Sequence, residues 1–216
     1  MLRPALATLA LLLHSPHSLA PAPPTTAGLA PVAFDPLPVG SIRPTGWLKS
    51  QLLLQADGLS GHMALFWDDI VKSVWIGGRY KEGDGLNEDL PYWANGFVPL
   101  VFLLKEERPE LAAQLASTVD KIVASQKSDG WYGPYDKPKG DGDRYWRQYP
   151  FLLALTQYSE AVAVSDPSHS AALVASIRKF LHGLSSWIKQ TPVQSWAHYR
   201  WQDMAMTIFW MIDHHP

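Results

Sequence analysis

The part of this sequence richest in groups capable of chemistry is residues 85–100, where an amide, two carboxylates and two large aromatic side chains precede an apolar run. Glu88 is the candidate catalytic carboxylate, because apolar neighbours such as Tyr92 and Trp93 raise the pKa of a carboxyl group. The first N–H groups of a helix lack intrahelical partners, and this end of the helix carries partial positive charge. The combination favours a ligand-binding surface at a helix start.

A second interpretation of the same stretch is purely structural. Asn87 or Asp89 would cap the helix, while Tyr92 and Trp93 would fill the core, since capping residues and buried aromatics are common. Glu88 would then be a helix-terminal charge that faces water. Both interpretations remain open from these residues alone.

Further candidates for ligand contact lie later in the chain. Trp131, Tyr132 and Trp146 have rings that can stack on sugar faces or pack between helices. Arg147 can bind a hydroxyl or carboxylate group, or pair with an acid, and Asp203 is a second candidate carboxylate or a solvated helix residue. The predicted substrate-binding residues are Asn87, Glu88, Tyr92, Trp93, Asn95, Trp131, Tyr132, Trp146, Arg147 and Asp203. We expect the aromatic loops that carry them to converge at one end of a helical array.

The composition excludes several functional classes. The chain has 216 residues and a formal net charge of −2, which argues against a nucleic-acid partner because such proteins present a basic face. It contains no cysteine, so cysteine nucleophiles and thiolate zinc sites are excluded. The histidines show no metal-ligand spacing, and we predict neither a metal nor a cofactor.

The N-terminal residues predict export. Residues 1–20 combine an early arginine, an apolar run and a small-x-small ending at Ala20, the pattern of a signal peptide. The run is too short to span a bilayer, so we expect a secreted protein without membrane association after cleavage. Residues 21–32 are a Pro/Ala-rich linker, and residues 33–216 are the expected folded part.

Apolar side chains at spacings of three and four residues predict an all-α chain. We expect helices after Pro44, over 92–104, from Pro109 onward, over 145–163, after the Asp166–Pro167 cap and over 200–213. A further apolar pattern covers 62–75. Helices and turns repeat as hairpins, which predicts an arc of an α/α toroid. A free-standing helical bundle is the alternative. We also expect an exposed apolar flank over 204–212 or 174–188.

Four stretches in order carry a resemblance to a known family. They are the 37–48 stretch LPVGSIRPTGWL, the 87–96 stretch NEDLPYWANG, the 149–158 stretch YPFLLALTQY and the 202–204 stretch QDM. Together with the Gln-x-x-Asp-Gly turn at 126–130, they resemble β-L-arabinofuranosidase-like glycoside hydrolases (family 127 and relatives), which fold as six-hairpin (α/α)6 toroids. The resemblance covers about residues 34–216.

The resemblance implies a secreted hydrolase that acts on plant or microbial glycans. In the better-known members, a catalytic glutamate and a zinc held by cysteines lie further along the barrel, and this chain has no cysteine. A histidine-containing stretch of those members corresponds here to residues 145–148, which contain no histidine. We therefore expect the N-terminal portion of such an enzyme or a truncated gene model.

Two alternatives belong to other functional classes. One is a non-catalytic carbohydrate-binding pseudoenzyme, which needs aromatic rings in a groove but no pair of carboxylates. The other is an α/α-toroid polysaccharide lyase, for which Tyr92, Asn95 and Arg147 would supply the base and the charge-neutralising groups.

Overall fold

The computed structural model describes residue 34 and residues 36–83, 85–134 and 142–216. The expected signal peptide (1–20), the linker (21–32) and residue 33 lie outside the described residues. Residues 37–216 form one unit. Within the described residues no β-strand occurs. The only β-type backbone pairing among these residues is an isolated parallel bridge between Ser73 and Tyr80. The prediction of an all-α chain is thus confirmed.

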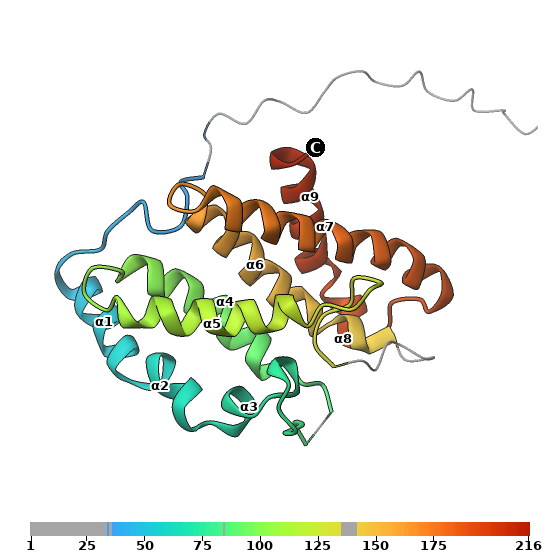
Figure 1. Cartoon of the computed structure of the whole chain (residues 1–216), viewed down its shortest axis with the longest axis horizontal. Coiled ribbons are helices and arrows are strands. Elements are labelled where there is room, and N and C mark those ends of the chain that lie inside the picture. Colours follow the sequence, from blue (N-terminus) through green and yellow to red (C-terminus); the bar gives the residue numbers. More distant parts are fainter. Residues whose placement is uncertain (1–33, 35, 84, 135–141) are drawn as a thin grey trace, which may run out of the picture. The chain divides into compact units, whose positions relative to one another are not determined.

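The helices follow one another along the unit, and α1 to α9 are labelled in Figure 1. In chain order they are α1 (Gly46–Asp57), α2 (Leu59–Phe66), α3 (Asp68–Val71), η1 (Val74–Ile76), α4 (Asp89–Leu103), α5 (Glu110–Ala124), η2 (Gly142–Tyr145), α6 (Gln148–Val162), α7 (Pro167–Gln190), α8 (Ser195–Tyr199) and α9 (Trp201–His214). The expected apolar pattern over 62–75 is divided between short helices, and the sequence reasoning did not anticipate α8.

Helix α6 is the centre of the packing, because it contacts α4, α7 and α9. It contributes buried side chains around its circumference, among them Tyr149, Phe151 and Leu155. A helix that is apolar on all sides is stable only when other helices cover it. The α4–α5 and α6–α7 pairs have short connections, so each pair is a helical hairpin of the predicted kind.

The turn after α5 fastens that helix to α7. Gly130 has a φ of 100°, a backbone conformation that glycine adopts without steric cost. The Gln126 amide donates to the carbonyl oxygens of Gly130 and Ser176, both at 2.9 Å, and its oxygen accepts from Ser176 Oγ at 3.0 Å. The Gln-x-x-Asp-Gly segment is therefore a structural connector. Helix α7 itself begins at the predicted cap, where Asp166 accepts the N–H of His169 at 2.9 Å.

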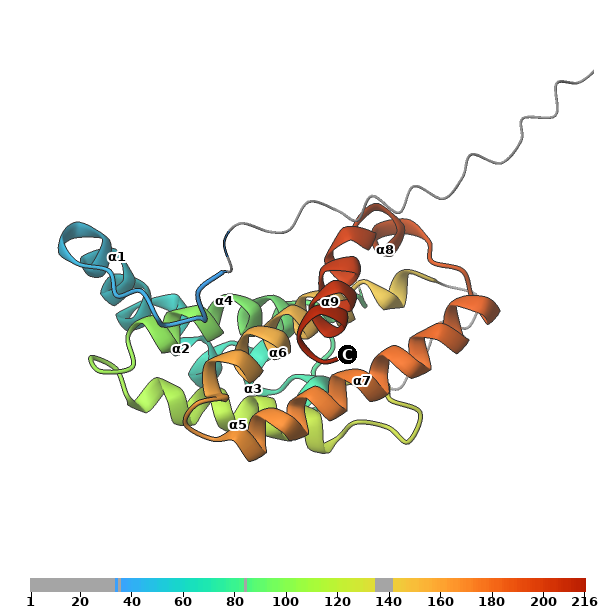
Figure 2. The same cartoon turned by 90° about the horizontal axis from the view of Figure 1, so that it is seen from above.

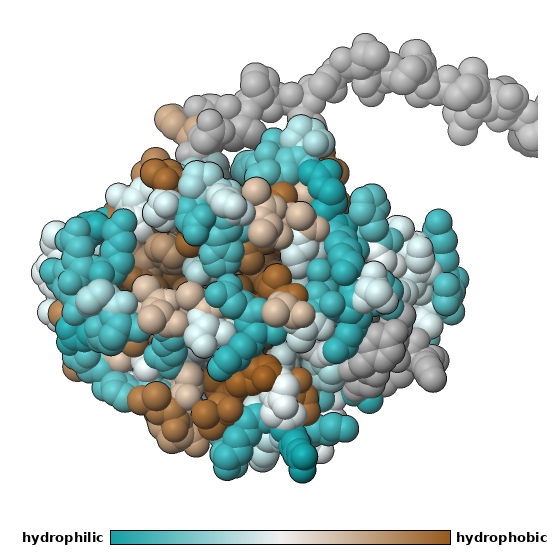
Figure 3. Space-filling model, in the orientation of Figure 1, coloured by the Kyte–Doolittle hydropathy of each residue, from teal (hydrophilic) through white to brown (hydrophobic). Residues whose placement is uncertain are grey.

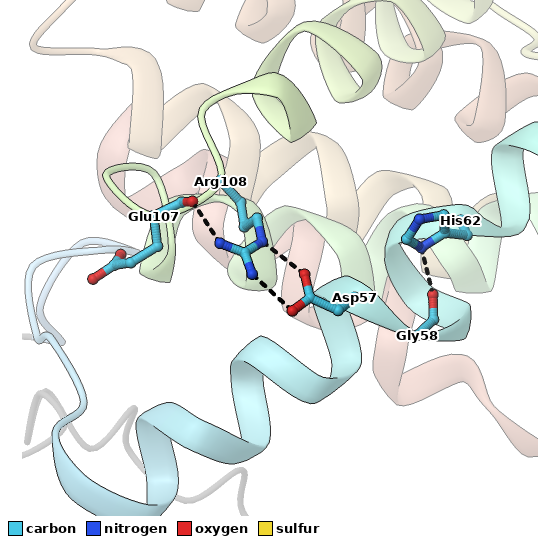
Figure 4. A network of polar contacts seen from close by, with 5 residues as sticks. All are labelled: Asp57, Gly58, His62, Glu107 and Arg108. Carbon is cyan, nitrogen blue, oxygen red and sulfur yellow. Dashed lines mark hydrogen bonds and ion pairs between the residues drawn. The ribbon is translucent and has the colours of Figure 1, made fainter.

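Helix α1 projects from the other helices, as Figure 2 shows, and Ala56 is its only buried residue. Its C-terminal end is attached to the α4–α5 connection by Arg108, which donates to both carboxylate oxygens of Asp57 at 2.7 Å (Figure 4). This two-pronged hydrogen bond lowers the pKa of Asp57. The same figure shows His62 bonded to the Gly58 carbonyl oxygen at 2.9 Å.

Apolar side chains are exposed on several parts of the unit, among them Trp47 and Leu54 on α1. Figure 3 shows hydrophobic surface over the α2–α3 region, where Leu65, Phe66 and Trp67 are exposed. On α9 the exposed apolar residues are Trp201, Met206, Ile208, Phe209 and Ile212. By contrast, the apolar residues of α7 are largely buried. Of the two expected apolar flanks, only the one on α9 is exposed.

None of the described helices is both long enough and apolar enough to cross a membrane.

Candidate functional site

The N-terminal end of α4 is built by the loop that precedes it. The Glu82 carboxylate accepts the backbone N–H groups of Glu88 and Asp89, both at 2.8 Å. It thereby satisfies two of the donors that a helix start leaves unpaired. The capping residue is thus Glu82, and the structural interpretation that assigned this role to Asn87 or Asp89 was wrong.

Asn87 instead shapes the loop. It has a φ of 54°, a left-handed conformation that asparagine adopts more readily than most residues. Its side chain accepts the N–H of Glu82 at 3.3 Å and donates to the Gly85 carbonyl oxygen at 2.9 Å. Its own carbonyl oxygen accepts from Trp75 Nε1 at 2.7 Å. Asn87 is buried, so its contribution is to hold Glu88 in place.

Glu88, Tyr92 and Trp146 meet beside this helix start. Trp146 Nε1 donates to Glu88 Oε2, a contact that joins residues 58 positions apart. The Tyr92 ring lies edge-on to the Trp146 ring at a centroid distance of 5.7 Å. Trp146 is buried, whereas 43% of Tyr92 is exposed, so Tyr92 is the ring that solvent or a ligand can reach.

Two charged residues from the C-terminal helices complete the group. Arg200, which connects α8 to α9, places its guanidinium carbon 5.3 Å from the centre of the Trp146 ring. The pKa of Tyr92 is raised, first by burial and then by the negative charge of Glu88, while Arg200 lowers it and Asp203 raises it. All three charges are therefore within electrostatic reach of the Tyr92 hydroxyl. We call Glu88, Tyr92, Trp146, Arg200 and Asp203 the Glu88 cluster.

Trp131 and Tyr132 do not belong to this surface. Both side chains are completely buried, and neither presents a ring face to solvent. Trp131 packs on Phe180 and Trp187 of α7 and donates to the Pro134 carbonyl oxygen at 2.9 Å. Tyr132 stacks on Phe180 at 5.6 Å, and its hydroxyl shares a hydrogen bond of 2.6 Å with Ser176. The convergence expected of these two rings with Glu88 is therefore not seen at a common surface.

Three other predicted site residues have partners within the helical unit. Trp93 donates to the Ser60 carbonyl oxygen at 3.0 Å and stacks on Phe97 at 4.5 Å. Asn95 accepts from Gln157 at 2.7 Å, which links α4 to α6. Arg147 is buried and donates to the Leu86 carbonyl oxygen at 3.3 Å. These contacts position helices α4 and α6 and the loop that leads into α4 at Glu88.

A pocket of about 270 Å³ opens beside Tyr92, lined by Met63, Trp67, Ile70, Asp89, Tyr92 and Trp93. Near it, Asp69, Glu82 and Asp89 place carboxylate oxygens within 4.8 Å of one another. Hard cations favour such oxygens, but Glu82 already accepts two backbone N–H groups and Asp69 accepts the Trp67 indole N–H. These bonds explain why the acidic residues are close to one another, and we assign no metal to them.

The sequence reasoning missed Arg200, Glu82 and Trp75. Glu82 precedes the residues it caps by six and seven positions, so it has no local capping spacing. The Arg200 contact with Trp146 depends on how the α8–α9 segment packs against η2 and α6. No pattern within either segment encodes these pairings.

Comparison with known proteins gives no match: no family model, no curated sequence and no solved structure is similar to this chain.

Proposed function

We propose that this protein is a secreted, glycoside hydrolase-like protein that binds plant or microbial glycans at the Glu88 cluster. The observation that carries the proposal is the meeting of the Glu88 carboxylate, the Trp146 indole N–H and the half-exposed Tyr92 ring. Sugars have apolar faces that stack on aromatic rings and hydroxyl groups that need polar partners. The cluster offers both kinds of contact at one surface.

In the proposed reaction the two carboxylates have complementary roles. Glycoside hydrolysis uses one carboxyl group as proton donor and a second as nucleophile or base. We assign the first role to Glu88, which accepts the Trp146 indole N–H beside the exposed Tyr92 ring, and the second to Asp203, the other carboxylate whose charge acts on Tyr92. Trp146 orients Glu88 through its hydrogen bond, and Tyr92 supplies the stacking surface.

The described contacts favour this proposal over a polysaccharide lyase. Burial and the charge of Glu88 raise the pKa of Tyr92, so its hydroxyl stays protonated and is a poor general base. Arg147 is buried and Asn95 is bonded to Gln157, so neither is placed to neutralise a substrate charge. A carbohydrate-binding pseudoenzyme remains the second candidate, because stacking and hydrogen bonding alone suffice for binding.

We further propose that the hairpins belong to an (α/α)6 toroid of the β-L-arabinofuranosidase-like kind. The α4–α5 and α6–α7 hairpins pack through α4 and α6, as successive hairpins of a toroid do. The exposed apolar side of α9 is the surface on which a further hairpin would pack. The resemblance stated for the sequence is the reason for proposing this family, and the packing of the two hairpins through α4 and α6 supports the proposed arrangement.

Glu88→Gln and Asp203→Asn test the roles of the two carboxylates, with Asp213→Asn on the exposed side of α9 as the matched control. Binding and turnover are measured on oligosaccharides that contain arabinose, galactose or glucuronate. We expect each site variant to lower turnover by about 100-fold or more while binding persists, because general acid–base catalysis contributes that much. The control should match the wild type.

Other outcomes separate the alternatives. Binding by the wild type without turnover would favour the pseudoenzyme. An unsaturated, ultraviolet-absorbing product would favour the lyase. Absence of binding to every oligosaccharide would overturn the proposed function. Trp131→Ala is unsuitable as a site variant because this buried ring packs against α7, so its removal would disturb the fold.

A further inference from the structure

Arg200 is the cationic member of the Glu88 cluster. Its guanidinium carbon lies 5.3 Å from the centre of the Trp146 ring, a cation–π arrangement that restrains the side chain. Trp146 is in turn fixed by its hydrogen bond to Glu88 and by edge contacts with Tyr92 and Tyr149. The guanidinium is thus held beside the ring that also contacts Glu88 and Tyr92.

The hydrogen-bonding groups of this guanidinium are available. Arg200 is exposed, and within the described residues its side chain makes no hydrogen bond or ion pair. A guanidinium presents N–H groups in a planar fork that matches the two oxygens of a carboxylate. The cation–π contact with Trp146 uses none of these N–H groups in a hydrogen bond, so they are left for a ligand.

The charges near Arg200 indicate which kind of ligand would need this arginine in order to bind. Glu88 and Asp203 act on the same Tyr92 hydroxyl as Arg200 does, so this part of the surface combines two negative charges with one positive charge. A neutral sugar can bind beside these carboxylates without Arg200, whereas an acidic sugar would be repelled by them. Specificity for an acidic sugar would therefore rest on this one arginine.

We propose that Arg200 binds the carboxylate of a uronic acid residue, so that the ligand of the Glu88 cluster is an acidic glycan. This inference rests on the proposed carbohydrate-binding function and adds the substrate class. Arg200 acts as a specificity-determining residue, and Trp146 is the residue that positions it.

The test compares trigalacturonic acid, whose carboxylates are charged, with its fully methyl-esterified form, in which methyl groups remove these charges. Binding of each to the full chain is measured by calorimetry for the wild type, Arg200→Lys and Arg200→Gln. The control is Arg178→Gln, an exposed arginine on α7 that bonds the His215 carbonyl oxygen. Circular dichroism confirms that each variant is folded.

We expect the wild type to bind the acid about tenfold or more tightly than the ester, since hydrogen bonds between charged groups contribute on this order. Arg200→Gln should reverse the preference, because Glu88 and Asp203 then repel the acid. Arg200→Lys should retain part of the preference, since it keeps the charge without the fork. Arg178→Gln should behave as the wild type.

Equal wild-type binding of acid and ester overturns this inference and leaves the proposed function standing. The same holds if Arg200→Gln lowers the affinity for both probes equally, because the arginine would then stabilise the site without distinguishing a charged ligand from a neutral one. If neither probe nor any neutral oligosaccharide binds, both the inference and the proposed function are overturned.

Discussion

At the level of single residues, Trp146 shows how a buried aromatic side chain organises a surface. Only 4% of it is exposed, yet it contacts Glu88, Tyr92, Tyr149 and Arg200. An indole has one N–H donor at its edge and a negative π face, so it can bind a carboxylate and a cation at the same time. The ring predicted to stack on sugars thus orients the charged groups, and Tyr92 is the exposed ring.

Tyr158 makes stability sensitive to alkaline pH. Burial, followed by the charges of Asp120 and Asp166, raises the pKa of Tyr158 to about 12. An unfolded tyrosine titrates near pH ~10, so the unfolded chain loses this proton first as the pH rises. The stabilisation is therefore complete below about pH 10 and is lost progressively toward about pH 12.

We expect Tyr158→Phe to reduce the loss of unfolding free energy between about pH 8 and about pH 11, as measured by urea denaturation. Tyr199→Phe, at a side chain that is 72% exposed, is the control and should leave the pH dependence unchanged. If the unfolding free energy falls with pH equally steeply in the wild type and Tyr158→Phe, Tyr158 is not the cause of the alkaline loss of stability.

At the level of helices, one side chain makes several of the hydrogen bonds that connect α5 to α7. Gln126 bonds the carbonyl oxygens of Gly130 and Ser176 as well as the Ser176 hydroxyl, which in turn bonds Tyr132. Removing the Gln126 side chain leaves its interior polar partners without hydrogen bonds, and an unpaired buried polar group costs more free energy than one hydrogen bond contributes. The turn therefore couples the first hairpin to the second.

Gln126→Ala should lower the free energy of unfolding by about 1–3 kcal/mol, because these hydrogen bonds are lost in a partly buried site. The matched control is Gln114→Ala, also on the α5 side of the hairpin, where the amide nitrogen has no hydrogen-bond partner within the described residues. That variant should have little effect or a stabilising one. Equal destabilisation by the two variants in urea titrations would show that the network contributes nothing specific.

At the level of the whole unit, apolar residues lie on both sides of α9. Met204 and Met211 face inward, while Met206, Phe209 and Ile212 are exposed. A surface helix normally carries polar residues on its solvent side. An exposed apolar side of this kind favours association with another surface.

We expect the wild-type chain to self-associate with rising concentration and to bind a hydrophobic dye, because the α9 surface is apolar. Phe209→Glu combined with Ile212→Lys should weaken both effects. The control pair, Ser186→Glu with Gln190→Lys, places the same charges at exposed positions on α7. If sedimentation shows that the two double variants self-associate equally, the α9 surface is not the site of self-association.

Helix positions and several of their ends follow from local rules. The Asp166–Pro167 cap, the break at Gly130 and the apolar stripe of α5 act within a few residues, so the sequence alone predicts them. The candidate carboxylate Glu88 was found in the same way, because its aromatic neighbour Tyr92 lies one helical turn away.

Which aromatic rings are exposed is a property of the packing between helices. Trp131 and Tyr92 occur in similar polar and aromatic surroundings along the sequence, but α7 covers Trp131, while Tyr92 remains 43% exposed. Arg200 likewise reaches Trp146 because the α8–α9 segment packs on η2 and α6. Burial and charge pairing depend on contacts between distant segments, and a local pattern does not specify which segments become neighbours.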